Sequence, residues 1–314
     1  MRHRIALPAE LGDHFSVKKA STLGLGRARA DAADLERPFH GVRSISAPDT
    51  FRAHVDCYVP RLRPGQRFVG RTAARIWELP HPTPWCTDEP LQIAVPQDQS
   101  PPRTSGVEGR RLRTERAQTW MLGDVPVVDP IAAVLSSAGE LTETEIVILL
   151  DALISDSSNY PGRDNVRWPR VTGDVVVERV ALWDRFAGSS RVKRAIPRMR
   201  PGVESPKETE TRLLLVDGGL PEPDVQYVVR KEGRFVARVD LAYPRWRIAI
   251  EYEGDGHRRD RSQWRRDIAR QRALEDLGWI VIRLTQDDLD DPRAFVARVR
   301  RAVVRRGSLA QATR

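Results

Sequence analysis

The stretch that begins at Val239, VDLAYPRWRIAIEYEGDGH, constrains the fold of this chain more than any other. Two short runs with β-forming residues, 235–241 and 247–252, lie on either side of Pro244, which cannot continue a central strand and favours a turn. The stretch therefore predicts a β-hairpin. Its second strand alternates Ile248, Ile250 and Tyr252 with Ala249, Glu251 and Glu253. One face is thus predicted to be apolar and to pack on the core, and the other to carry two carboxylates.

A third acid is predicted to lie on the same face as these two. Asp240 is at the end of the first strand, and the hairpin register puts it opposite residues 249–251. Directly opposed Cβ atoms are about 5 Å apart, so the carboxylates repel one another unless one is protonated or a cation lies between them. Carboxylate oxygens are the ligands that Mg²⁺ prefers. The pattern predicts a Mg²⁺ (or Mn²⁺) site with Asp240 and Glu251 as metal ligands.

The charge of the chain indicates a polyanionic partner. Lys and Arg number 52 against 43 Asp and Glu, which gives a net charge of +9 and a pI near 10.1. Nucleic acid is the first candidate and an acidic membrane surface the second. The two cysteines, Cys57 and Cys86, form no CxxC pair, which argues against a disulfide framework or a zinc knot. With no signal-peptide core and no apolar run of about 20 residues, we expect a soluble cytoplasmic protein without a membrane partner.

Residues 1–50 have the order of a helix-turn-helix. A predicted helix at 15–20 is followed by a glycine-bearing turn and a second predicted helix at 27–35, which begins with Arg27 and Arg29. Residues 39–43 suit a small β-wing. The segment resembles the degenerate winged helix of AbiEi-type (type IV toxin–antitoxin) antitoxin-like proteins, which implies DNA contacts and a cognate toxin. A packing module without DNA contacts is an equal alternative.

Residues 51–200 are predicted to form a mixed, mainly helical, AbiEi-like region. Helices are expected at 71–79, 131–136, 141–155, 175–186 and 191–199, and short strands at 91–95 and 125–128. Asp151 and Asp156 have no metal-ligand partners nearby in sequence, so we expect both to be solvated acids on a helix surface. A basic stretch with Pro and Gly at 198–204 predicts a domain boundary.

Residues 205–306 are predicted to form a third domain. Ser205, Pro206 and Glu208 begin a helix with a capping box. Glu208 then has a sufficient structural role, although a place at the metal site is an equal alternative. A strand at 225–229, the hairpin, a helix at 261–277, a strand at 279–284 and a helix at 292–305 follow, giving the order αβββαβα.

This third domain resembles the PD-(D/E)XK nucleases, and more narrowly the Vsr-like (very-short-patch-repair type) endonuclease relatives of unknown function. The matching pieces are Ser205-Pro-Lys-Glu208-Thr, Gly219-Leu-Pro221, Val239-Asp240-Leu, Glu251-Tyr-Glu-Gly254 with His257, Asp267-x-x-Arg270 and Gly278-Trp279. The resemblance implies a restriction-endonuclease-like αβββαβ fold with a Mg²⁺ site. Glu253 stands at the position of the motif's lysine, and His257 is the best substitute for the missing base.

The site residues expected from these patterns fall into two groups. The catalytic group is Glu208, Asp240, Glu251, Glu253 and His257. The nucleic-acid-binding group is Arg27, Arg29, Arg258, Arg265, Arg266 and Arg270. Together they predict a Mg²⁺-dependent DNA endonuclease or nickase with an N-terminal DNA-targeting module. The alternative is a non-catalytic, antitoxin-like transcriptional regulator that binds DNA and retains a decayed nuclease fold.

Overall fold

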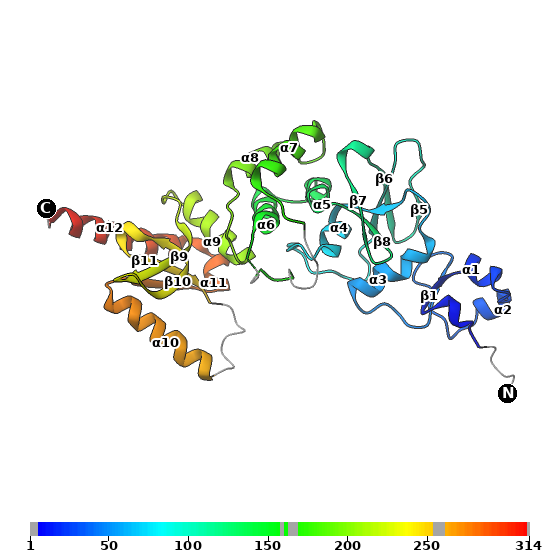
Figure 1. The fold of residues 1–314 in the computed structure, drawn as a ribbon, viewed down its shortest axis with the longest axis horizontal. Coiled ribbons are helices and arrows are strands. Elements are labelled where there is room, and N and C mark those ends of the chain that lie inside the picture. The colour runs from blue at the N-terminus through cyan, green and yellow to red at the C-terminus, as the bar shows by residue number, and fades with distance from the viewer. Residues whose placement is uncertain (1–5, 158–159, 163–168, 254–260, 313–314) are drawn as a thin grey trace. The chain divides into compact units, whose positions relative to one another are not determined.

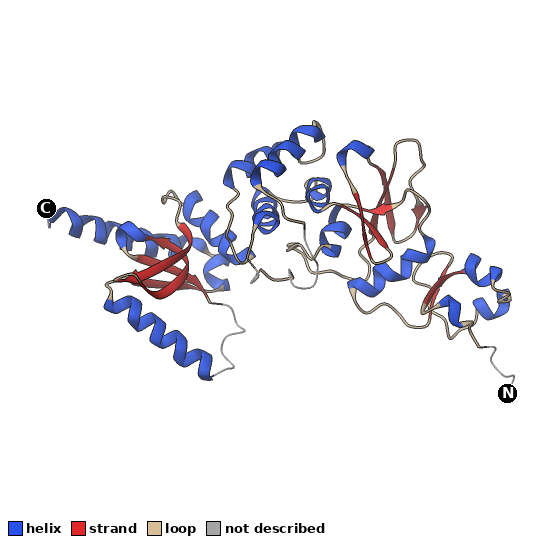
Figure 2. Cartoon of the chain, viewed as in Figure 1, coloured by secondary structure: helices blue, strands red, loops and turns tan. Residues whose placement is uncertain are grey.

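The computed structural model describes residues 6–157, 160–162, 169–253 and 261–312, and its contacts divide the chain into two compact units. Unit 1 comprises Met1–Thr142 and Asp174–Val192, and unit 2 comprises Glu143–Gly173 and Lys193–Arg314. Both units combine helices with sheets (Figure 2), so the predicted α/β class is confirmed. None of the helices in these described ranges is long and apolar enough to cross a membrane.

Unit 1 begins with two short helices beside a two-stranded ribbon. The elements are β1 (His14–Ser16), α1 (Val17–Thr22), α2 (Arg27–Ala30) and β2 (Val42–Ser44), and β1 pairs antiparallel with β2. The second helix is therefore one turn long, and the expectation of a helix at 27–35 is wrong. The chain leaves the helix at Asp31, whose carboxylate accepts a hydrogen bond from Arg43. Short acidic side chains that bond outside the helix favour such an ending.

The rest of unit 1 is built on a six-stranded sheet of order β5-β6-β4-β3-β8-β7. The strands are β3 (Arg67–Phe68), β4 (Leu91–Val95), β5 (Arg103–Thr104), β6 (Val107–Arg111), β7 (Thr119–Leu122) and β8 (Val125–Val128). The helices are α3 (Phe51–Tyr58), α4 (Gly70–Ile76), α5 (Pro130–Ser137) and α7 (Gly173–Trp183). The predicted strands β4 and β8 are confirmed, and four further strands, β3, β5, β6 and β7, were not predicted. Strands β3 and β5 are two residues long, β6 (VEGRR) is strongly polar, and β7 (TWML) has three apolar residues in a row, so none shows the alternation that marks a strand in sequence.

Unit 2 is built on a four-stranded sheet of order β12-β11-β10-β9. Its elements are α6 (Glu143–Ile154), α9 (Pro206–Asp217), β9 (Asp224–Lys231), β10 (Arg234–Tyr243), β11 (Ile248–Tyr252), α10 (Arg261–Asp276), β12 (Ile280–Leu284), α11 (Gln286–Asp290) and α12 (Pro292–Ala312), and α8 (Ser189–Ala195) leads into it. Strands β9, β10 and β11 are antiparallel neighbours, and β12 runs parallel to β11. The predicted hairpin and the order αβββαβ are confirmed.

Helices cover both faces of this sheet (Figure 1). On one face, Ile248 and Ile250 pack with Leu215 of α9 and Phe295 of α12. On the other face, Ala249 packs with Leu274 of α10. Strand β11 is therefore buried from both sides, and the carboxylate-bearing face of the hairpin lies under a helix.

Unit 2 also contains α6, which the predicted boundary at 198–204 leaves out. Asp151 of α6 is fully buried, and its Oδ2 accepts hydrogen bonds from Thr209 Oγ1 at 2.9 Å and Arg212 Nη2 at 2.8 Å. The expectation that Asp151 is solvated is wrong, because its helix face packs on α9. Asp156 is exposed beside Arg170, as expected.

Candidate functional site

The predicted acids line a cleft of about 1210 Å³ in unit 2. Its walls come from α9, β10, β11, α10 and β12, and they carry acidic and arginine side chains together. The lining residues are Ser205, Glu208, Val236, Arg238, Asp240, Glu251, Tyr252, Glu253, Arg266, Asp267, Ala269, Arg270, Ala273 and Arg283. The sequence missed Arg238 and Arg283. Arg238 was within reach of pattern analysis, because it lies two positions before Asp240 on the same strand face.

Asp240 lies where the hairpin register was expected to put it. Leu241 pairs with Ile250, so the next step along the ladder brings Asp240 beside Glu251. Its Oδ2 accepts a hydrogen bond from the backbone N–H of Tyr252 at 3.1 Å. Burial, and then the charges of Glu208 and Glu251, raise the pKa of Asp240 to about 7. The carboxyl group can therefore gain or lose a proton near neutral pH.

Glu251 is held by Arg270. Its side chain is buried, and Arg270 Nη1 and Nη2 donate to its two carboxylate oxygens at 2.7 and 2.9 Å. The same Nη1 donates to the backbone oxygen of Arg238 at 3.1 Å. This bidentate geometry fixes the Glu251 carboxylate and the Arg270 guanidinium relative to each other. Arg270, expected to contact nucleic acid, lines the cleft and supplies the positive charge that the buried carboxylate needs.

Glu208 takes part in the cap of α9 and also lines the cleft, but only the Ser205 half of the expected capping box is formed, since the Glu208 carboxylate accepts from the backbone N–H of Glu204 and not of Ser205. Ser205 Oγ accepts from the backbone N–H of Glu208 at 3.2 Å and donates to Glu208 Oε1 at 3.0 Å. Glu208 Oε2 accepts from the Glu204 backbone N–H at 3.0 Å and from Gln226 Nε2 at 2.9 Å. Burial raises the pKa of Glu208. The side chain is thus fixed at the start of α9, close enough to Asp240 to raise that group's pKa.

The remaining residues predicted for this site differ in their burial and in whether they line the cleft. Glu253 is half-buried, with its carboxylate 3.8 Å from the Arg283 guanidinium. Arg266 lines the cleft, and Arg265 is exposed on the same helix. His257 and Arg258 lie outside the described residues.

In the N-terminal module, only one of the two predicted arginines is at the surface. The Arg27 side chain is 94% exposed, 3.6 Å from Asp31. The Arg29 side chain is 11% exposed, and its two Nη atoms donate to Asp34 at 3.1 and 3.2 Å. The expectation that Arg29 contacts DNA is wrong for this arrangement, because the guanidinium is part of the internal packing.

The carboxylate oxygens at the cleft are ligands of the type that a divalent cation takes, but too few of these side chains are grouped to hold one. Carboxylate oxygens are the ligands that Mg²⁺ and Mn²⁺ take. Within the part of the chain that the structure describes, however, no three His, Cys, Asp or Glu side chains are grouped to hold a metal ion. Both oxygens of Glu251 are bonded to Arg270. The described side chains therefore do not fit a complete metal site.

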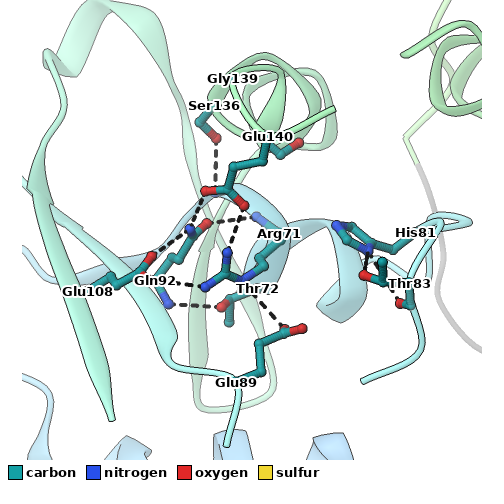
Figure 3. A network of polar contacts seen from close by, with 12 residues as sticks. Arg71, Thr72, His81, Thr83, Glu89, Gln92, Glu108, Ser136, Gly139 and Glu140 are labelled. Carbon is teal, nitrogen blue, oxygen red and sulfur yellow. Dashed lines mark hydrogen bonds and ion pairs between the residues drawn. The ribbon is translucent and has the colours of Figure 1, made fainter. Parts of the chain in front are cut away.

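A second polar cluster, in unit 1, was not predicted (Figure 3). Gln92 is fully buried, and its Nε2 donates to Glu108 at 2.8 Å and to Glu140 at 2.7 Å. Arg71 contacts the same two carboxylates at 3.3 and 2.7 Å, and its backbone N–H donates to Gln92 Oε1. The members lie far apart in sequence, so no local pattern marks them. Their mutual bonds connect α4, β4 and β6, which is a structural role.

No family model matches the chain, and no solved structure matches it with significance. The chain is similar to two proteins of Mycobacterium tuberculosis, "Uncharacterized protein MT2308" of strain CDC 1551 / Oshkosh and "Uncharacterized protein Rv2248" of strain ATCC 25618 / H37Rv. Each is 37% identical over 100 residues, which is 32% of this chain. The match spans 37% of the length of each relative.

Proposed function

We propose that unit 2 is a DNA endonuclease or nickase that hydrolyses phosphodiester bonds at the acid- and arginine-lined cleft. The observation that carries the proposal is the convergence of Glu208, Asp240 and Glu251, from three different elements, on one cleft. Burial raises the pKa values of Glu208 and Asp240, and the charges of Glu208 and Glu251 raise that of Asp240 further. Such an arrangement is destabilising in itself and is typical of functional sites.

The order αβββαβ and the mixed sheet support a restriction-endonuclease-like fold for this unit. In that fold the central hairpin carries the reacting carboxylates, and β10 and β11 carry Asp240 and Glu251 here. We propose this fold for unit 2 together with its Vsr-like resemblance.

The side chains of the cleft suit two parts of the reaction. Arg238, Arg266 and Arg283 bring positive charge to a place where a DNA phosphate can approach the acids. Asp240, with a pKa of about 7, can accept a proton from an attacking water at neutral pH. These roles use only groups that this chain supplies.

Dependence on Mg²⁺ or Mn²⁺ stays a prediction, since the described side chains do not form a complete metal site. Arg270 and a divalent cation compete for Glu251, because both neutralise the same carboxylate. A nuclease that uses a divalent cation at Glu251 needs this carboxylate free of Arg270, whereas a non-catalytic regulator does not.

The rival is a non-catalytic DNA-binding regulator of antitoxin-like type, located in the cytoplasm and paired with a toxin. Two observations favour it: Glu251 is already neutralised by Arg270, and Glu253 stands where the nuclease motif has lysine. In both proposals the N-terminal module targets DNA, with the exposed Arg27 as a candidate contact.

Incubation of the pure protein with supercoiled plasmid separates the two. We expect nicked or linear plasmid with Mg²⁺ or Mn²⁺, none with EDTA, and none with the Glu251→Gln variant. Intact plasmid under every ion tried, from protein that binds the same plasmid in a gel-shift assay, would leave the regulator as the better account.

A further inference from the structure

Gln226 has an unusual backbone conformation inside strand β9. Its φ angle is 49°, in the left-handed region that residues other than glycine rarely adopt. The other described non-glycine residues with a positive φ lie in turns or directly after a helix: Glu78, Asp184, Glu232 and Arg247. A strained conformation within a strand costs energy and persists only where the surroundings hold it, which is common at functional sites.

The Gln226 side chain reaches the start of α9. Its Nε2 donates a hydrogen bond to Glu208 Oε2 at 2.9 Å. Glu208 also accepts hydrogen bonds from Ser205 Oγ and from the Glu204 backbone N–H. All three donors are neutral, so together they fix the buried carboxylate without adding charge beside it.

The strand register puts Gln226 in line with the acids of the cleft. The β9–β10 ladder places Gln226 opposite Asp240, because the residues on either side of each pair with one another. Asp240 lies beside Glu251, which pairs with Arg283. These four residues form one row across the sheet, and the last three line the cleft. Gln226 therefore reaches the cleft through Glu208, which it holds at the end of this row.

We propose that Gln226 is a positioning residue of the cleft, and that its amide holds the Glu208 carboxylate beside Asp240 in the arrangement needed for phosphodiester hydrolysis. The inference rests on the proposed function, since it takes the cleft as the place of hydrolysis. The strained backbone then has a direct use, because it accompanies a strand side chain that bonds to α9. A neutral donor suits this position, since a Glu there would add a carboxylate to the three that already converge on the cleft.

Single-turnover cleavage of an end-labelled duplex, with saturating full chain and Mg²⁺ or Mn²⁺, tests this role. Gln226→Asn keeps an amide and a residue that tolerates a positive φ, but its side chain is one methylene too short to hold Glu208. Gln226→Gly removes the donor and relieves the strain outright. We expect both variants to cleave roughly 10- to 100-fold more slowly, as for the loss of one hydrogen bond to a charged group.

Two further measurements exclude a merely structural effect. DNA affinity, measured by fluorescence anisotropy in EDTA, and the melting temperature should both change little in these variants, since relief of strain offsets the lost hydrogen bond. The matched control is Gln271→Asn on α10, where Gln271 Nε2 donates to Glu275 Oε1 at 2.8 Å. This variant shortens another Gln–Glu pair, away from the residues that line the cleft, and should leave the cleavage rate unchanged.

A double-variant cycle shows whether Gln226 acts through Glu208. Glu208→Ala alone should slow cleavage, and adding Gln226→Gly to it should slow cleavage no further. Losses that add in full would contradict the inference, because Gln226 would then act independently of Glu208.

The outcomes separate this inference from the function on which it rests. Cleavage at the wild-type rate by Gln226→Asn and Gln226→Gly overturns the inference and leaves the nuclease standing. Slower cleavage that matches a loss of folded protein or of DNA affinity has the same consequence. No cleavage by a wild-type protein that occupies the duplex fully overturns both.

Discussion

Replacing Asp240 by Asn should have little effect at pH 4, stabilise unit 2 increasingly as pH rises from 4 to 7, and stabilise it fully above pH 7. The folded-state pKa of Asp240 is about 7, against an ordinary value of 3.8. Because this pKa is raised, the favourable contribution of the protonated carboxyl is fully present below pH 4 and is lost as pH rises through 7. A pKa difference of about three corresponds to about 4 kcal/mol. Asn does not ionise, so the variant should avoid that loss.

Hydrogen–deuterium exchange of peptides from β10 and β11 is a suitable assay, because it reports the free energy of opening of this unit alone. The full chain is measured in EDTA between pH 4 and pH 8, with intrinsic exchange rates corrected for pH. We expect Asp240→Asn and wild type to agree at pH 4 and to diverge by up to about 4 kcal/mol at pH 8. Asp276→Asn, at an exposed position on α10, serves as control. A constant difference between Asp240→Asn and wild type across this range would refute the reasoning.

Three further predictions follow from the structure. Asp151→Ala should destabilise unit 2 by about 3–5 kcal/mol in urea unfolding, because it breaks a buried ion pair, whereas Asp156→Ala, at an exposed position, should change stability by less than about 1 kcal/mol. Gly70→Ala should lower the melting temperature more than Gly123→Ala, since both have positive φ but only the first would place Cβ 2.0 Å from Gln92 Oε1; equal losses would contradict this. DNA affinity should fall with salt by about 0.9 log units per log of salt for each phosphate contact, and an affinity that is flat in salt would reject phosphate-driven binding.

The sequence predicted the central hairpin and the element order of unit 2 because local patterns specify them. Pro244 ends the first strand, and the alternation in 248–252 specifies a second one. Ser205 and Pro206 mark the start of α9 by cap chemistry alone. Asp240 could be placed beside Glu251 because a hairpin of known length has only a few registers.

What the sequence could not predict depends on contacts between distant segments. Arg270 is 19 residues from Glu251, and nothing local shows that its guanidinium bonds the carboxylate. Asp151 and Arg212 are 61 residues apart, so a solvated acid was the natural expectation for a lone Asp on a helix. The two-residue strands β3 and β5 exist through their neighbours in the sheet, and no sequence period of that length can indicate them.

The central claim is that Glu251 acts in cleaving DNA and not merely in holding the fold. The most direct test is single-turnover cleavage of an end-labelled duplex by wild type and by Glu251→Gln, with Mg²⁺ or Mn²⁺ and at protein concentrations that give equal DNA occupancy. We predict that cleavage by the variant slows by roughly 100-fold or more while its DNA affinity persists. Equal cleavage rates, or no cleavage by a wild-type protein that occupies the duplex fully, would contradict the claim.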